Sequence, residues 1–168
     1  VVPDWYLNEY DGPLDRHSIP QQESVTQLSS NQVWQFGVPG NIKFGRGSRE
    51  FLFAELARSG VRRPFVVTDG NLRHVPQVAV VCDQLAHDSD AFIVFDGGNP
   101  EPTIEIAKRA IEVARQIDAD GIIGIGGGSN LDVAKVVALV LRHGGEPAEY
   151  FGFGRVPGPV LPLFALPT

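Results

Sequence analysis

The sequence predicts an α/β domain with a doubly wound, mostly parallel sheet and helices on both faces. From about residue 64 onward, short apolar runs alternate with segments in which apolar residues recur every three or four positions. The first pattern is typical of buried strands and the second of amphipathic helices. Strands joined through helices form parallel sheets, and such sheets bind ligands beyond the carboxyl ends of their strands.

Residues 1–30 are predicted to form an N-terminal arm outside this domain. The segment is polar, shows no sustained periodicity and is interrupted by three prolines, Pro3, Pro13 and Pro20. Terminal segments of this kind are poorly ordered unless another element holds them. The α/β domain is therefore expected to span residues 31–168.

Two short strands and a helix are predicted at the start of the domain. Residues 33–38 and 41–44 read as strands and are separated by the turn signal Pro39-Gly40. The helix that follows carries apolar residues along one face, with Ser48 as its N-cap and Gly60 at its end.

Three strand–helix units and a last strand complete the predicted sheet. The strands are expected at three apolar runs, residues 64–68, 91–95 and 121–125. The helices are expected after Pro76, over residues 103–117, and from Ser129 to a stop at Gly144-Gly145. A further apolar run at residues 159–166 is the last strand.

A triple glycine before the last of these helices is the most informative feature of the chain. Gly126, Gly127 and Gly128 remove every side chain from the turn. Ser129 suits the N-cap, and Asp132 three residues later completes a capping-box pattern. A bare turn that opens a helix leaves backbone N–H groups unpaired at the positive end of the helix dipole. The turn is therefore predicted to bind an anion such as phosphate.

The turn differs from two well-known phosphate loops. A Walker loop places Lys directly after its last glycine, whereas here Ser129 follows the glycines and the next lysine is Lys135. The dinucleotide fingerprint G-x-G-x-x-G is met by Gly124 and Gly126, but Ser129 stands where its third glycine belongs. A structural alternative also stays open, in which the glycines only allow tight packing, Asp132 only caps the helix and Lys135 is only solvated.

Composition excludes several classes of protein. With 14 Lys and Arg against 20 Asp and Glu, the formal net charge is −6 and no basic run appears, so the charge pattern of a nucleic-acid binder is absent. No apolar stretch reaches the roughly 18 residues that span a membrane, and no signal peptide is visible. The single cysteine, Cys82, excludes an internal disulfide and is expected to be an inert thiol in a reducing, cytoplasmic compartment. The four histidines are scattered, so no metal site is expected within this chain.

Five stretches of the chain carry a family resemblance. They are Ile-Lys-Phe-Gly-x-Gly (42–47), Val-Val-Thr-Asp (66–69), Asn-Pro-x-Pro-Thr (99–103), Gly-Gly-Gly-Ser-x-x-Asp-x-Ala-Lys (126–135) and Leu-Pro-Thr (166–168). In this order they resemble the N-terminal half of the iron-containing alcohol dehydrogenases, which belong to the dehydroquinate synthase-like superfamily. The resemblance implies that residues 31–168 are a Rossmann-like, nucleotide-binding domain.

The same resemblance implies an activity that this sequence carries only in part. Members of the family transfer hydride between an alcohol or aldehyde and a nicotinamide cofactor. A divalent metal, Fe²⁺ or Zn²⁺, polarises the substrate oxygen and is held by Asp and His residues of an all-helical C-terminal domain. That domain is absent from this sequence, so the chain is expected to hold no catalytic or metal-ligating residue and to have little or no turnover alone.

The resemblance also assigns cofactor contacts to the glycine-rich turn and its helix. The pyrophosphate would be held by the three glycines, Gly126, Gly127 and Gly128, together with Ser129. Asp132 would lie near the nicotinamide ribose, and Lys135 would support that corner of the site.

Three more residues are assigned to the cofactor cleft by resemblance. Asp69 sits where the family contacts the adenosine ribose, and a carboxylate there accepts from a 2′-OH but repels a 2′-phosphate, which favours NAD over NADP. Asn99 would border the cleft, and Thr168 matches the first Thr of a further family motif. Asp69 and Asn99 could instead serve only as turn residues before Gly70 and Pro100.

Two other functions stay open at this level. One is an enzyme like dehydroquinate synthase or glycerol-phosphate dehydrogenase, which share the glycine-rich turn and the sheet. The other is a non-catalytic nucleotide-binding module.

The strands at residues 33–44 would leave an exposed edge. Because this region often pairs across a dimer in the resembling family, a homodimer or higher homo-oligomer is expected. The remaining partner expected is a small alcohol or aldehyde substrate, with no nucleic acid and no membrane.

Overall fold

The computed structural model describes residues 34–37 and 40–168, all of which belong to the unit Val33–Thr168. The predicted arm at residues 1–30 lies outside the described residues. Strand β1 (Trp34–Gly37) pairs antiparallel with β2 (Asn41–Phe44), so the two strands predicted at the start of the domain form a hairpin. Gly40, which immediately precedes β2, has a φ of +104°, a conformation that only glycine adopts readily.

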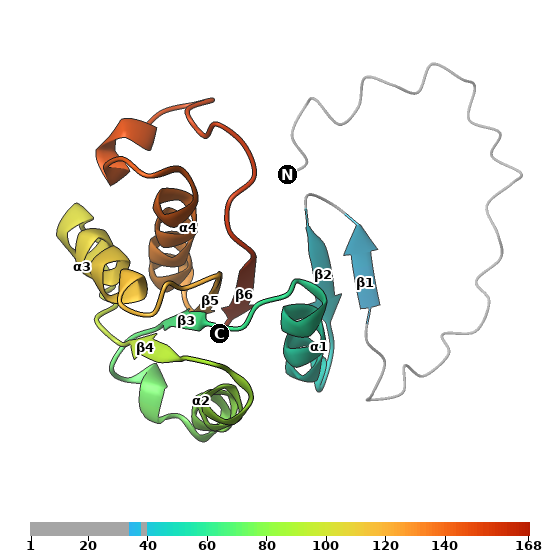
Figure 1. Ribbon diagram of the computed structural model, residues 1–168. Helices are drawn as coiled ribbons and strands as arrows, with labels where there is room; N and C mark the ends of the chain where they lie inside the picture. Colours follow the sequence, from blue (N-terminus) through green and yellow to red (C-terminus); the bar gives the residue numbers. More distant parts are fainter. Residues whose placement is uncertain (1–33, 38–39) are drawn as a thin grey trace, which may run out of the picture. The chain divides into compact units, whose positions relative to one another are not determined.

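A four-stranded parallel sheet forms the centre of the domain, which confirms the predicted fold class (Figure 1). Its strand order is β4-β3-β5-β6, and every neighbouring pair is parallel. The strands are β3 (Pro64–Val67), β4 (Ile93–Phe95), β5 (Gly121–Gly126) and β6 (Leu163–Pro167). The sheet reverses its direction of growth at β3 and β5, and in sheets of this type the ligand crevice opens at that point.

Helices cover both faces of this sheet. The helices are α1 (Phe51–Arg58), α2 (Pro76–Asp88), α3 (Ile104–Arg115) and α4 (Gly128–His143), with 3₁₀ turns η2 (Ser48–Glu50), η3 (Leu72–His74) and η4 (Pro147–Tyr150). Helices α3 and α4 share one hydrophobic core with the sheet, and α1 and α2 share a second core with it. The α/β chain is therefore doubly wound.

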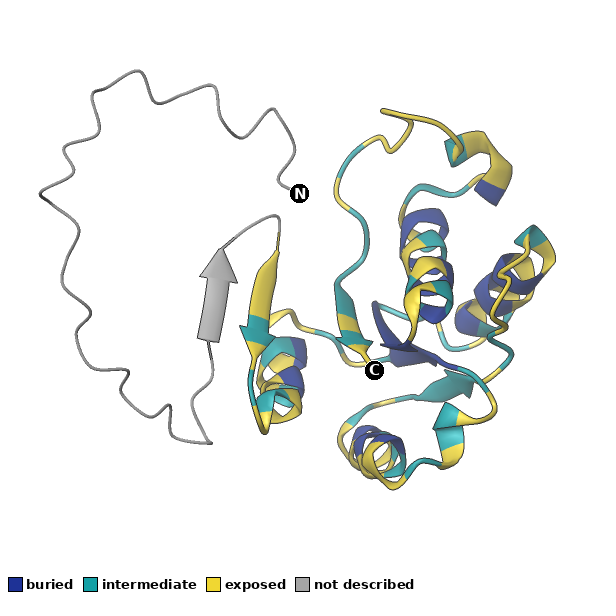
Figure 2. Cartoon of the chain, turned by 180° about the vertical axis from the view of Figure 1, so that it is seen from behind, coloured by how far each residue is buried: buried dark blue, intermediate teal, exposed yellow. Residues whose placement is uncertain are grey.

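Alternating side chains of the central strands build these two cores. In β3, Phe65 and Val67 face α3 and α4, whereas Val66 between them faces α1 and α2. Strand β5 is buried along its whole length, with Ile122 in one core and Ile123 in the other (Figure 2). Burying one such side chain contributes about 1.5–3 kcal/mol, so packing in the two cores stabilises the central strands.

Several element boundaries differ from the prediction for local reasons. Strand β6 begins at Leu163 rather than at residue 159, because Pro159 and Pro162 lack the N–H groups that a sheet ladder needs. Ser48 opens the 3₁₀ turn η2 and does not cap α1. Thr103 lies just outside α3 and caps it, since its Oγ1 accepts from the Ile106 amide at 3.3 Å.

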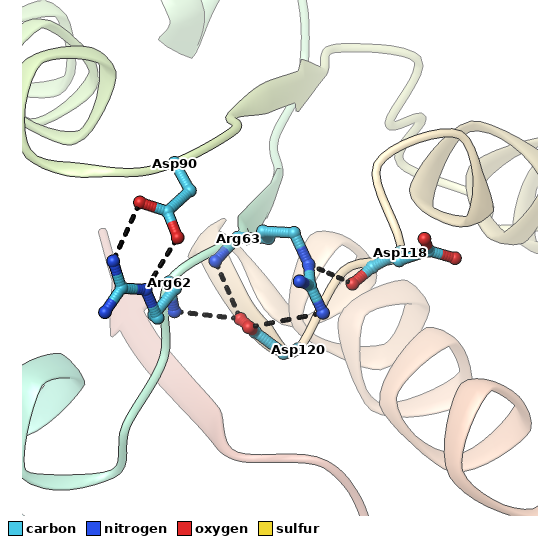
Figure 3. A network of polar contacts seen from close by, with 5 residues as sticks. All are labelled: Arg62, Arg63, Asp90, Asp118 and Asp120. Carbon is cyan, nitrogen blue, oxygen red and sulfur yellow. Dashed lines mark hydrogen bonds and ion pairs between the residues drawn. The ribbon is translucent and has the colours of Figure 1, made fainter.

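Five residues tie together the segments that lead into the amino ends of β3, β4 and β5 (Figure 3). The Asp120 Oδ1 atom accepts from the amides of Arg62 and Arg63 at 3.0 and 2.8 Å. The Arg62 guanidinium donates to both carboxylate oxygens of Asp90 at 2.6 and 3.0 Å. The Arg63 side chain donates to the backbone carbonyl of Asp118 at 2.7 Å. We name these five residues the amino-end network; it fixes three strands that are distant in sequence.

Candidate functional site

Loops that follow β3, β4 and β5 enclose a cavity of about 430 Å³ at the carboxyl edge of the sheet. A cavity of this size is within the range of small-molecule and cofactor sites. It is lined by Asp69, Gly70, Asn71, Gly98, Asn99, Pro100, Gly127, Ser129 and Asn130. Asp69 after β3, Asn99 after β4 and Gly127 after β5 therefore converge in space.

The start of α4 differs from the prediction. Gly127 is the N-cap, the helix begins at Gly128, and no side chain caps it. The predicted capping box of Ser129 and Asp132 does not form. Instead, the Ser129 hydroxyl donates to the Pro100 carbonyl at 2.7 Å, which ties the turn to the loop after β4. Ser129 thus lies inside the first helical turn and holds two walls of the cavity together.

Backbone amides at this helix start are free to bind a ligand. The first helical hydrogen bond runs from the Leu131 amide to the Gly127 carbonyl at 3.2 Å. In the part of the chain that the structure describes, the amides of Gly127, Gly128 and Ser129 donate to no protein acceptor. Free amides at the N-terminus of a 16-residue helix carry the partial positive charge that anions bind.

Asp69 supplies a carboxylate to the opposite wall of the cavity. Its Oδ1 atom accepts from the amides of Asn71 and Leu72, both at 3.0 Å. Its Oδ2 atom accepts from the Asn130 side chain at 2.8 Å. Partial burial raises the pKa of this carboxyl, but the hydrogen bonds from Leu72, Asn130 and Asn71 outweigh that effect and hold the pKa below its usual 3.8. Asp69 is therefore ionised at neutral pH.

Asn130 is a site residue that our sequence reasoning missed. Its side chain is only 3% exposed, and its amide nitrogen donates to Asp69 and, at 3.1 Å, to the Ile125 carbonyl. One signal could have revealed it. Asn130 precedes the buried residues Ala134 and Val137 by four and seven positions, so helical spacing places it on the face of α4 that turns toward the sheet.

The remaining predicted residues separate into two groups. Asn99 is exposed and lines the cavity, and the Thr168 amide donates to the Gly126 carbonyl at 3.4 Å, beside the glycine turn. Asp132 and Lys135 do not line the cavity. They form an exposed ion pair with each other at 2.9 Å, with side chains 62% and 63% exposed. Their roles near the nicotinamide ribose stay predictions.

Two further properties bear on the chemistry available here. Within the described residues, no three His, Cys, Asp or Glu side chains gather into a group that could hold a metal ion. None of the helices that the structure describes is both long enough and apolar enough to cross a membrane.

The fold and the cavity together define a class of protein: doubly wound α/β domains with a cavity at the switch point of the sheet. Comparison with known proteins identifies the family. The model of the family "Iron-containing alcohol dehydrogenase" matches residues 39–168. The chain therefore belongs to the iron-containing alcohol dehydrogenases, and the family resemblance of the sequence is confirmed.

Individual relatives agree with this assignment. Alcohol dehydrogenase 4 of Schizosaccharomyces pombe is 31% identical over 143 residues, which cover 85% of this chain and 34% of the relative. The crystal structure of the NADH-dependent butanol dehydrogenase A of Thermotoga maritima superposes with a TM-score of 0.67 at 27% identity, covering 81% of this chain and 34% of that protein. Sulfoacetaldehyde reductase of Bifidobacterium kashiwanohense, solved in complex with NAD⁺, gives 0.64 at 26% identity, with 82% and 36% covered. The chain thus spans about a third of the length of these relatives.

Proposed function

We propose that this chain is the NAD-binding part of a metal-dependent alcohol dehydrogenase, which transfers hydride between an alcohol or aldehyde and a nicotinamide cofactor. One observation carries the proposal. Gly127 and Ser129, whose amides are free among the described residues, line the same cavity as the ionised Asp69 carboxylate. A dinucleotide needs both features, because its diphosphate is an anion and its ribose offers hydroxyl donors.

The residues of the cavity suit the parts of NAD. The amides of Gly127, Gly128 and Ser129 would hold the diphosphate, and Asp69 would accept a hydrogen bond from the adenosine ribose. A carboxylate at that place repels the 2′-phosphate of NADP, so NAD is the proposed cofactor. The bound nicotinamide would supply the site that accepts or gives the hydride. Two of the similar structures are described as NADH-dependent and as a complex with NAD⁺, which supports this choice.

Among the described residues, no group of side chains could serve as ligands for the metal of the proposed enzyme. We therefore propose that Fe²⁺ or Zn²⁺ is held by residues of a longer protein, in the two thirds of the relatives' length that this chain does not span. This chain alone is then expected to bind NAD without oxidising an alcohol. NADH formation from an alcohol by these 168 residues in isolation, with no second polypeptide present, would contradict that expectation.

A homodimer formed through the β1–β2 hairpin is proposed as the assembly. Two large apolar side chains of β2 are exposed, Ile42 by 50% and Phe44 by 71%. Exposed large apolar side chains on a short hairpin favour contact with a second chain. Sedimentation tests this assembly, and a purely monomeric full-length protein would refute it.

The proposed compartment is the cytoplasm, and the proposed substrate is a small alcohol or aldehyde.

Calorimetric titration with NAD, NADP and ADP tests the cofactor proposal. We expect NAD to bind more tightly than NADP, and ADP to bind through the same amides with lower affinity. If none of the three binds, the anion site is not a nucleotide site and the proposal fails. If only a phosphorylated substrate binds, the chain serves a different enzyme of the same fold.

A further inference from the structure

A single buried carboxamide connects the three loops that build the cavity. The Asn130 amide nitrogen donates to Asp69 after β3 and to the Ile125 carbonyl at the end of β5. The Asn130 side chain also lies beside Gly98 in the loop after β4, so close that a Cβ atom on Gly98 would clash with it. Loops that are far apart in sequence, with Asp69 and Asn130 separated by 61 positions, therefore meet at one side chain.

Two glycines leave the space that this carboxamide occupies. A Cβ atom on Gly98 would lie 2.1 Å from Asn130 Oδ1 and 2.5 Å from the Thr68 carbonyl oxygen. A Cβ atom on Gly126 would lie 2.3 Å from Asn130 Nδ2. Real Cβ atoms do not approach other atoms so closely, so both positions need glycine while Asn130 keeps this orientation. The carboxamide is thus held from two sides by backbone.

The contacts of Asp69 show what this orientation does. The Oδ1 atom is held by two backbone amides of its own loop, and that contact alone would let the loop turn as a unit. The Oδ2 atom accepts from the side chain of Asn130. This residue belongs to α4, the helix that follows the proposed diphosphate-binding turn. A hydrogen bond to a charged acceptor is shorter and stronger than one between neutral groups. It therefore sets the position of the carboxylate relative to the helix.

Building on the NAD site proposed above, we propose that Asn130 is a positioning residue for cofactor choice. It holds the Asp69 carboxylate at a fixed place relative to the amides at the start of α4. The ribose and the diphosphate of one dinucleotide can then bind to the two groups at the same time. Without it, Asp69 turns with its loop and no longer meets the 2′ position. Discrimination between NAD and NADP then falls, although the amides still bind a diphosphate.

The test compares the affinities of NAD and NADP in four forms of the full-length protein, the wild type and the variants Asn130→Ala, Asp69→Asn and their combination. In Asn130→Ala we expect the NAD affinity to fall about tenfold while the NADP affinity changes by less than about threefold. Asp69→Asn should also lower the ratio of NAD affinity to NADP affinity. In the combined variant the Asn130 change should add little, because a residue that acts through Asp69 has no effect once Asp69 is neutral.

Controls separate positioning from a general structural role. Val133→Ala removes a buried side chain of α4, only 2% exposed, that packs in the core shared with α3 and makes no hydrogen bond through its side chain. It should lower the melting temperature yet leave the ratio of NAD to NADP affinity unchanged. Asn130→Ser, a smaller polar replacement, provides a second variant if Asn130→Ala does not fold, and it should show the same loss of discrimination.

Each outcome decides the inference. An unchanged affinity ratio in both Asn130 variants overturns it, and so does an Asn130 effect that persists in full in the Asp69→Asn background. Wild-type protein that binds NAD and NADP equally overturns it while leaving the NAD site standing. Wild-type protein that binds neither dinucleotide overturns the inference and the proposed function together.

Discussion

The two ends of the parallel sheet use the same kind of residue for opposite purposes. At the amino end, Asp120 accepts two backbone amides, and its other oxygen lies 3.6 Å from the Arg63 guanidinium. At the carboxyl end, Asp69 also accepts two backbone amides, but its other oxygen meets the neutral side chain of Asn130. One aspartate is paired with a cation and the other keeps an uncompensated charge.

Backbone donors show the same contrast. The amides of Arg62 and Arg63 are used within the amino-end network, whereas those of Gly127, Gly128 and Ser129 have no protein acceptor in the described part of the chain. Groups that are satisfied within the protein add stability, and groups that are left open can bind a ligand. The proposed site therefore lies at the end of the sheet where backbone donors are left open, and the amino end is the one where they are used for stability.

The largest effect is expected from filling the space at the carboxyl end. Gly126 has a φ of +132°, and a Cβ there would also lie 2.8 Å from the Leu72 side chain. Gly126→Ala should therefore lower the free energy of unfolding by roughly 2–4 kcal/mol and abolish NAD binding. Gly127→Ala is the matched control, since its Cβ would meet nothing within 4 Å. Urea unfolding measures both; equal stability of the two variants would refute the close packing described here.

A charge placed among the open amides should remove binding without removing the fold. A side chain on Gly128 would meet nothing within 4 Å, and an acidic residue at a helix N-terminus is favourable. In Gly128→Asp we expect the NAD affinity to fall about a hundredfold, because the new carboxylate repels the diphosphate. Gly128→Asn, with nearly the same shape and no charge, should lose far less. Calorimetry distinguishes them, and equal losses would show that charge is not the cause.

The amino-end network should respond in the opposite way. Asp120→Ala leaves the amides of Arg62 and Arg63 without their acceptor, which should cost about 1–2 kcal/mol of stability. NAD affinity should stay within about twofold of wild type, because the cavity lies at the other end of the strands. Asp118→Asn is the control, since only the backbone carbonyl of that residue accepts from Arg63. A large loss of NAD affinity in Asp120→Ala would mean that the two ends are coupled.

The smallest effect concerns pH and the exposed pair of Arg62 and Asp90. The hydrogen bond from Arg62 lowers the pKa of Asp90 below its usual 3.8. A carboxyl whose pKa is lower in the folded state adds stability above its unfolded pKa, and this is lost as the pH falls through the folded pKa. The melting temperatures of wild type and Asp90→Asn should therefore differ slightly at pH 6, and the difference should shrink as the pH falls below 3.8 and through the folded pKa of Asp90. Melting curves from pH 2 to 6 test this; a difference that grows on acidification would reverse the sign.

Local patterns were enough to predict most of the fold. The run of apolar residues at 121–125, the triple glycine and the helical spacing after it are adjacent in sequence, so the strand, turn and helix could be derived from sequence alone. The same holds for α2, which was predicted near Pro76 and begins at that residue. The convergence of Asp69, Asn99 and the glycine turn followed from the general topology of parallel sheets.

The sequence could not show which polar groups form hydrogen bonds with each other. Whether Ser129 caps the helix depends on a competing acceptor, the Pro100 carbonyl, which only the neighbouring loop brings within 2.7 Å. Whether Asn130 is solvated or buried depends on how α4 packs against the sheet. Sequence periodicity therefore determined the strands, the helices and the open turn, because those depend on neighbours along the chain. The strand order β4-β3-β5-β6 decided that Asp69 meets Asn130 and that Arg63 meets Asp120, because hydrogen bonds act over about 3 Å in space whatever the separation in sequence.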